Sequence, residues 1–100
     1  MSEKILSKVL IKINMRVVVL DRLGQETVFG KIECARNIFM LGDDENLVWQ
    51  VKSDFDVEGN PFTNIKYGQD GSLVAYRWDG GNYSIDADTG FASPIGSFIK

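Results

Sequence analysis

The sequence contains no histidine and only one cysteine. Histidine is the usual general acid or base near neutral pH and the commonest metal ligand, so Ser–His and Cys–His nucleophile pairs are excluded within the chain. The single cysteine, Cys34, excludes an internal disulfide and a cysteine zinc site and favours a reducing compartment. Its nearest basic neighbours in sequence are Lys31 and Arg36, so nothing predicts a reactive thiolate, and we expect a buried or bystander thiol.

Long apolar runs are also missing. No stretch of 18 apolar residues, the length that suggests a membrane span, occurs in the chain. The first 20 residues are apolar, but Lys8, Lys12 and Arg16 interrupt them and no small-residue cleavage site follows, so we expect no signal peptide. Together these features predict a cytoplasmic protein with no membrane partner.

The composition that remains is that of an ordinary folded protein. The 100 residues are 44% hydrophobic and 25% charged, which is enough for one compact domain with a modest core and too little for two. We therefore expect a single β domain over residues 1–100 that folds alone.

Charge is divided unevenly along the chain. Residues 1–36 carry a balance of +3, whereas residues 37–100 carry −6. The acidic excess is densest between residues 43 and 58, where only Lys52 opposes six acidic side chains: Asp43, Asp44, Glu45, Asp54, Asp56 and Glu58. Such a cluster repels nucleic acid and attracts a basic protein surface. The alternative is that it only keeps two loops soluble.

From residue 37 onward, apolar and β-branched runs alternate with clusters of Gly, Asp and Asn. This rhythm predicts an antiparallel meander that forms a twisted sheet or a small open barrel. The sharpest hairpin signal is Asp79-Gly80, because this pair tolerates the positive φ that tight turns need. The predicted strands are Asn37 to Leu41, Leu47 to Val51, Phe62 to Tyr67, Leu73 to Trp78 and Asn82 to Asp86.

Alternation with a period of two assigns faces to these strands. The apolar sets predict the core, and the opposite sets predict a wet face. The predicted core residues are Leu47, Trp49, Val51, Val74, Tyr76, Trp78, Tyr83 and Ile85, and the predicted wet residues are Gln50, Arg77, Asn82 and Ser84.

The first third is ambiguous. Ile5, Leu6, Val9, Leu10 and Ile13 recur at helical spacing, but β-branched residues favour strands. We expect a short helix or frayed start, followed by strands, with a further strand over Val28 to Glu33 after a turn at Leu23-Gly24-Gln25. The fold class is therefore all-β, or mainly β with a short N-terminal helix.

Two short motifs invite a chemical interpretation. Asp88-Thr89-Gly90 matches the aspartic-protease triplet, but only ten residues follow it, so we interpret residues 86–90 as a hairpin turn. Asp54 to Gly59 resembles the first half of a calcium-binding loop, but the twelfth position is Ile65 instead of a glutamate. There is no glycine-rich phosphate loop, and the aromatic strands lack interleaved basic residues. We predict no metal, no cofactor and no direct nucleic-acid partner.

A family resemblance rests on the strand and turn segments between residues 37 and 90. They are Asn37-Ile38-Phe39-Met40-Leu41, Leu47-Val48-Trp49-Gln50-Val51, Pro61-Phe62-Thr63-Asn64-Ile65, Leu73 through Gly80, and Tyr83-Ser84-Ile85-Asp86 through Thr89-Gly90. Together they resemble small bacterial immunity proteins of contact-dependent growth inhibition and related polymorphic toxin systems. The resemblance implies a stoichiometric inhibitor that binds a toxin domain, often a nuclease, and blocks its active site.

Three functions follow as hypotheses. The first is an immunity protein whose acidic segment meets a basic toxin surface, with Phe55 as an exposed anchor. The predicted contact residues are Asp43, Asp44, Glu45, Asp54, Phe55, Asp56 and Glu58. The second is a structural or self-associating β-module that pairs through an open sheet edge. The third, an enzyme that uses carboxylates such as Asp86 and Asp88 alone, ranks last because no specific catalytic signal supports it.

Overall fold

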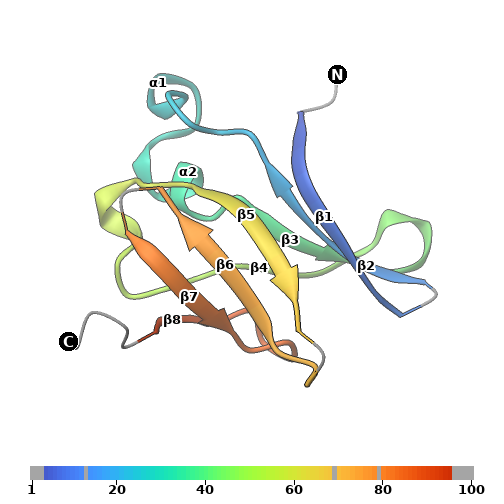
Figure 1. Cartoon of the computed structure of the whole chain (residues 1–100). Coiled ribbons are helices and arrows are strands. Elements are labelled where there is room, and N and C mark those ends of the chain that lie inside the picture. The colour runs from blue at the N-terminus through green and yellow to red at the C-terminus, as the bar shows by residue number, and fades with distance from the viewer. Residues whose placement is uncertain (1–3, 13, 69, 79, 96–100) are drawn as a thin grey trace.

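Two four-stranded antiparallel sheets make up the computed structural model of the protein (Figure 1), which describes residues 4–12, 14–68, 70–78 and 80–95. Each sheet is a meander in which neighbouring strands follow one another in sequence. The first sheet contains β1 (Ile5–Lys12), β2 (Met15–Leu20), β3 (Ile38–Leu41) and β4 (Leu47–Gln50). The second contains β5 (Phe62–Tyr67), β6 (Leu73–Arg77), β7 (Gly81–Ile85) and β8 (Ala92–Pro94).

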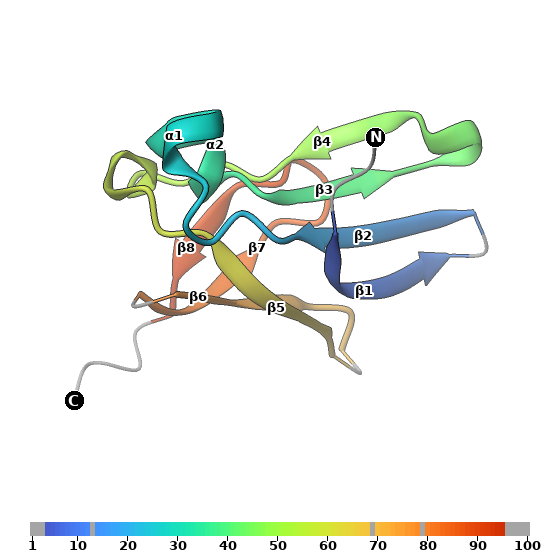
Figure 2. The same ribbon diagram turned by 90° about the horizontal axis from the view of Figure 1, so that it is seen from above.

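The predicted meander is confirmed, and it forms two stacked sheets without closing into a barrel. Figure 2 shows the sheets as two layers, with β1 and β5 next to each other at one side. At the other side, residue 52 forms a parallel bridge with residue 91, and the Lys52 amide donates to the carbonyl of Gly90 at 3.2 Å. The sheets are thus held together at both sides.

The core lies between the sheets and is built from alternate residues of the strands. Buried side chains of the first sheet, including Val17, Val19 and Ile38, face buried side chains of the second, including Phe62 and Leu73. Complete burial of such a side chain contributes roughly 1.5–3 kcal/mol. Burial of these side chains is the main favourable term, and the entropy lost on ordering the chain opposes most of it.

The five strands predicted between residues 37 and 86 are all present, with ends that shift by one residue in places. The turn predicted over residues 86–90 is also present, because the Gly90 amide donates to the carbonyl of Asp86 at 2.7 Å and joins β7 to β8. Of the Asp79-Gly80 pair, Asp79 lies outside the described residues, and the Gly80 amide donates to the carbonyl of Arg77 at 3.0 Å.

The strands predicted in the first third are confirmed as β1 and β2, whereas the short helix expected as one possible start is wrong within the described residues. Residues 5–12 form β1 because they pair along their length with β2. The strand expected over Val28 to Glu33 is replaced by two short helices, α1 (Glu26–Phe29) and α2 (Lys31–Ala35). Gly30 separates them with a φ of 83°, a conformation that breaks a strand as effectively as a helix.

The predicted faces of β6 are reversed. Leu73, Ala75 and Arg77 are buried, whereas Tyr76 and Trp78 are exposed. Arg77 was expected on the wet face. It instead lies inside the protein, where its guanidinium contacts an acidic side chain and aromatic rings. Leu47 is also exposed, because the pairing of β3 with β4 shifts register between Met40 and Leu41 and turns the first residue of β4 outward.

No helix in the described ranges is long and apolar enough to cross a membrane.

Candidate functional site

The acidic residues predicted to form one contact surface lie at two ends of the molecule. Asp43, Asp44 and Glu45 form a 3₁₀ turn at the tip of the β3–β4 hairpin, and the rest belong to the loop between β4 and β5. Figures 1 and 2 place the tip and the loop at opposite ends. Nine residue steps separate Glu45 from Asp54, about 30 Å in an extended chain, and the long dimension of the molecule is 37 Å.

Part of the negative charge at the hairpin tip is already matched within the protein. Arg16 forms an ion pair with Glu45, and the Asn14 amide donates to the Asp43 carboxylate at 3.1 Å. Asp44 and Glu45 both have positive φ, at 58° and 65°, which is uncommon for residues other than glycine. The tip is therefore an exposed acidic turn, part of whose charge is compensated.

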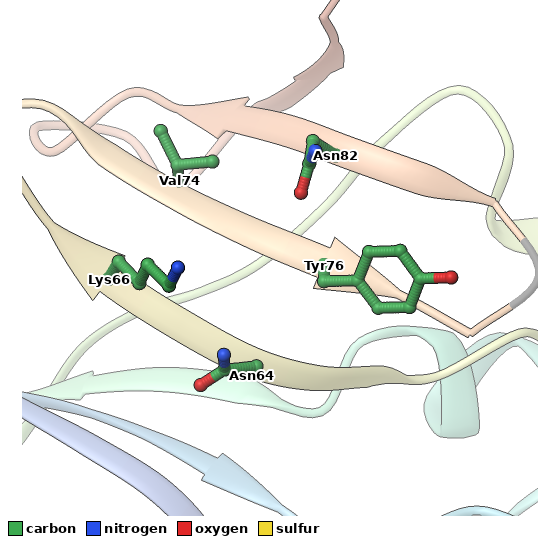
Figure 3. A pocket seen from close by; sticks show the side chains of 5 residues that line it. All are labelled: Asn64, Lys66, Val74, Tyr76 and Asn82. Carbon is green, nitrogen blue, oxygen red and sulfur yellow. The ribbon is translucent and has the colours of Figure 1, made fainter.

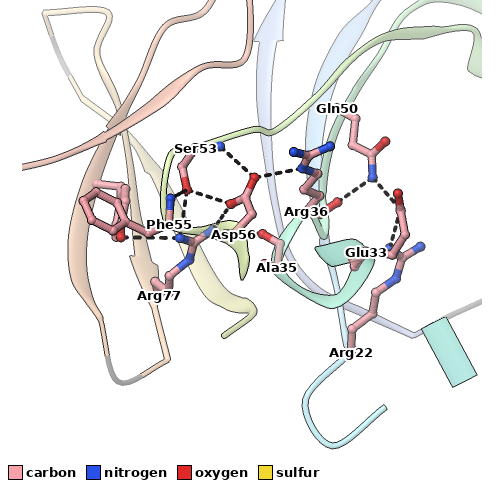
Figure 4. A network of polar contacts seen from close by, with 10 residues as sticks. Arg22, Glu33, Ala35, Arg36, Gln50, Ser53, Phe55, Asp56 and Arg77 are labelled. Atoms are coloured by element: carbon pink, nitrogen blue, oxygen red, sulfur yellow. Dashed lines mark hydrogen bonds and ion pairs between the residues drawn. The ribbon is translucent and has the colours of Figure 1, made fainter. Parts of the chain in front are cut away.

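The other group lies in the loop of residues 53–59, which we call the anchored loop because Asp56 fixes it from inside. The Asp56 side chain is only 2% exposed. Its carboxylate accepts hydrogen bonds from the Ser53 amide at 2.9 Å and the Ser53 hydroxyl at 2.6 Å. Arg36 Nε donates to it at 2.8 Å and Arg77 Nη2 at 2.9 Å (Figure 4). Asp56 is thus fully occupied and does not belong to an exposed contact set.

Arg77 is the main partner of Asp56 and is itself 2% exposed. Its guanidinium lies over the rings of Phe62 and Tyr83, at 4.2 and 4.7 Å from their centres. It also donates to the Ser53 hydroxyl at 3.0 Å and to the carbonyl of Ala35 at 2.9 Å. Arginine can stack its planar cation on aromatic rings and donate hydrogen bonds in several directions at once, which lysine cannot.

The same polar network extends to α2 and β4. Gln50 donates to the carbonyl of Arg36 at 2.8 Å and to the Glu33 carboxylate at 3.0 Å. Arg22 donates to the carbonyl of Glu33 at 2.8 Å and lies over the Phe29 ring at 4.3 Å. Figure 4 shows the hydrogen bonds and ion pairs of this network in one row, from the second sheet to the short helices. The anchored loop is therefore tied to both layers of the fold.

The pKa of Asp56 is set by two opposing effects. Burial by itself raises it, but the hydrogen bonds from Ser53, Arg36 and Arg77 together outweigh burial and lower the pKa below its usual value of 3.8. Asp56 therefore stays ionised at neutral pH, and its negative charge balances the buried guanidinium of Arg77.

While Ser53 and Asp56 are turned inward, the side chains of residues 54, 55, 57 and 58 of the anchored loop are exposed. Phe55 is 44% exposed and Val57 is 68% exposed, and the acidic residues Asp54 and Glu58 flank them. The backbone beneath is fixed by the Gly59 amide, which donates to the carbonyl of Asp56 at 3.0 Å. The loop thus presents two apolar side chains between two carboxylates on a backbone that is already ordered.

The other motifs have structural roles in this fold. The Asp86 carboxylate accepts from the amides of Asp88 and Thr89 at 2.8 and 3.3 Å, as in an ordinary turn. Cys34 is buried. Within the described ranges there is no group of three or more His, Cys, Asp or Glu side chains placed to hold a metal ion.

Asp54, Phe55 and Glu58, three of the predicted contact residues, are exposed, but sequence reasoning missed the residues that fix the loop, Arg77 above all. One available signal was the strand context of Arg77, which alternates with Leu73 and Ala75 and so could have been assigned to an inner face.

The fold and the site define a small β domain of two sheets, in which buried ion pairs hold one loop in place. The chain belongs to the family described as a domain of unknown function, DUF7957, whose model matches residues 1–96. No curated protein and no solved structure matches the chain.

Proposed function

We propose that this domain is a cytoplasmic immunity protein, which binds a cognate toxin domain and neutralises it by covering a basic active-site cleft. The contact surface is the anchored loop, with Phe55 and Val57 as apolar anchors and with Asp54 and Glu58 beside them. The domain acts by binding and supplies no catalytic group.

The observation that carries this proposal is the internal fixation of the loop through Asp56. A loop that is ordered before binding loses little conformational entropy when a partner docks, and this improves affinity without any new contact. Exposed aromatic anchors surrounded by polar residues are typical of binding hot spots. The anchored loop combines both properties at the surface.

The charge distribution supports a basic protein partner. The protein has a net charge of −3, and the two acidic residues of the anchored loop are exposed. A nuclease that binds RNA or DNA must present a basic cleft, and an acidic protein associates with such a cleft quickly. The same charge opposes direct binding of nucleic acid.

The acidic hairpin tip has a lesser role in this proposal. A standard interface covers about 800 Å² on each partner, a patch roughly 30 Å across, so one partner centred on the anchored loop does not also cover residues 43–45 at the opposite end. The screening length at physiological salt is about 8 Å. The tip therefore affects association weakly.

The probe is the C-terminal domain of a secreted protein encoded next to this chain, and a gene neighbourhood without such a protein would count against the proposal. We expect Phe55→Ala to weaken binding of this probe at least about tenfold, since loss of a central anchor costs about 2 kcal/mol or more. The double variant Asp54→Lys and Glu58→Lys should slow association and abolish protection of cells that express the toxin domain.

The control is the double variant Asp43→Lys and Asp44→Lys, which changes the charge equally at the other end of the molecule. It should leave the dissociation constant within about threefold of the wild-type value. Equal affinities for the wild type and both loop variants at low salt would overturn the proposal.

A second candidate, a self-associating β-module, is favoured by one observation. β1 is an edge strand of the first sheet, and Ile5, Leu6 and Leu10 on it are exposed. An apolar edge strand of eight residues is a template for pairing with a second copy. Light scattering of the purified chain tests this: a stable dimer that Leu10→Lys converts to a monomer supports the module, and a monomer at all concentrations excludes it.

A further inference from the structure

The outer face of the second sheet carries a polar depression that is separate from the anchored loop. Five side chains from three adjacent strands line it, and its volume is about 380 Å³. They are Asn64, Lys66, Val74, Tyr76 and Asn82 (Figure 3). The volume lies in the usual range of small-ligand sites, about 300–1,000 Å³.

The strand register places two amides on either side of Tyr76, whose ring extends along β6 toward the end of the strand in Figure 3. Tyr76 of β6 lies directly opposite Asn64 of β5 and Asn82 of β7. Since neighbouring strands are about 4.8 Å apart, the two asparagines are separated by roughly 9.6 Å across the tyrosine. That width accommodates one hexose ring with a hydrogen bond of about 2.9 Å at each side.

The amide of Asn64 is held in one orientation. Its Oδ1 accepts hydrogen bonds from the Ser7 hydroxyl of β1 at 3.0 Å and from the Ile65 amide at 2.8 Å. With the oxygen occupied, the Nδ2 group remains to donate toward the depression, and Figure 3 shows it on the side of Lys66 and Tyr76. This donor is therefore positioned before any ligand arrives.

The floor and the ring supply an apolar surface beside these polar groups. Tyr76 is 45% exposed, and Figure 3 shows its ring lying broadside along the sheet. Val74, half-buried on the same strand, lines the depression two residues before Tyr76. An exposed aromatic face next to amide donors and acceptors matches a ligand that has an apolar C–H face and a polar rim.

We propose that this depression binds a neutral oligosaccharide. One sugar ring stacks on Tyr76, and its hydroxyl groups bind the amides of Asn64 and Asn82. Lys66 donates a further hydrogen bond to a hydroxyl or ring oxygen at the edge. Ser7 does not touch the sugar and acts as a positioning residue through Asn64.

Two other ligand classes fit the observations less well. A peptide that adds a strand needs unpaired backbone groups, but β6 is an inner strand paired on both sides with β5 and β7. A single-stranded nucleic acid needs a positively charged groove along its backbone, but Lys66 is the one charged side chain among the five that line the depression. A ligand without charge, recognised by stacking and hydroxyl contacts, avoids both requirements.

The test is a ¹H–¹⁵N NMR titration of the whole chain with maltohexaose, cellohexaose and chitohexaose, each added separately. We expect at least one of them to shift the amide signals of residues 64–66, 74–76 and 82 in a saturable way. Tyr76→Ala should weaken that binding by about threefold to tenfold, the range expected for the loss of one aromatic stacking contact. Ser7→Ala should weaken it severalfold without loss of the folded spectrum.

The matched control is Tyr67→Ala. Tyr67 is as exposed as Tyr76, at 42% against 45%, and does not line the depression, so its removal should leave the dissociation constant unchanged. The proposal is overturned if none of the three sugars shifts these signals at about 10 mM, enough to saturate a site with a Kd of about 1 mM. Equal effects of the two tyrosine variants, or shifts produced by a single-stranded oligonucleotide instead, would also overturn it.

Discussion

Asp56→Asn removes one negative charge from the interior while keeping the shape of the side chain. The change leaves the buried guanidinium of Arg77 and the neighbouring Arg36 without the carboxylate that both now contact. Removal of one partner from a buried ion pair costs about 3–5 kcal/mol. A domain of this size has a total stability of roughly 5–15 kcal/mol, so the variant should lose a large part of it.

Urea unfolding followed by tryptophan fluorescence measures this loss, because Trp49 is buried in the core and becomes exposed on unfolding. In a thermal unfolding experiment, each kcal/mol of lost stability lowers the melting temperature of a domain of this size by about 4–8 °C. The melting temperature should therefore fall by at least roughly 12 °C. The double variant Asp56→Asn and Arg77→Met removes both charges and should recover at least about 1 kcal/mol relative to the sum of the single changes.

The matched control is Asp54→Asn, the same chemical change two residues earlier at an exposed position. Its effect should stay within about 0.5 kcal/mol. If both asparagine variants changed the free energy of unfolding by the same small amount, the anchoring role of Asp56 would be refuted.

The pH dependence of the unfolding free energy tests the role of Asp56 in a second way. The folded-state pKa of Asp56 lies below its usual value of 3.8, so its contribution to stability is complete above that value. The contribution is lost as the pH falls through the lower folded-state pKa. Between about pH 5 and pH 2, the unfolding free energy of Asp56→Asn should therefore fall less than that of the wild type.

Three further predictions concern the core and the turns. Gly90→Ala should lower the unfolding free energy by about 2 kcal/mol or more in a urea titration, because Gly90 has a φ of 82° and an added Cβ would lie 2.6 Å from the Trp49 ring. Leu73→Ala should lower the free energy of unfolding by about 2–5 kcal/mol and Tyr76→Ala by less than about 1 kcal/mol, since only Leu73 faces the core. The reverse order would mean that the faces of β6 are those expected from hydrophobicity. Cys34 is fully buried, so a thiol reagent should label it only at the rate of unfolding, and rapid labelling of the native protein would contradict this placement.

From residue 37 onward, local sequence patterns were sufficient for the strands but not for the direction of their side chains. Alternation along β6 defines two sets of residues, and Tyr76 with Trp78 looks more apolar than Leu73 with Arg77. The structure reverses this choice because Asp56, from a loop 21 residues away, neutralises Arg77. A contact between distant segments has no signature in the local pattern, so hydrophobicity alone selected the wrong face.

The acidic segment was misjudged for a related reason. Counting charges along the sequence treats residues 43–58 as one unit, but β4 is an extended strand that carries its two ends far apart. Moreover, a count does not reveal that Asp56 points inward while Asp54 points outward. Exposed and buried aspartates in one loop differ only in their partners, and those partners come from α2 and β6.

The short helices were missed because their residues favour strands. Val28 and Ile32 are β-branched, which led to the predicted strand over this segment. The positive φ of Gly30 ends α1 and begins α2, and Arg22 packs against Phe29 to hold the turns in place. The tertiary contact therefore overrides the local preference.

The proposed contact surface is the anchored loop. The decisive measurement is amide hydrogen exchange of this chain, free and mixed with the C-terminal domain of a secreted protein encoded next to it. Exchange should slow on binding at residues 54–59 and in the neighbouring α2, while residues 43–45 stay unchanged. Slower exchange at residues 43–45 with an unaffected loop would contradict the proposed surface.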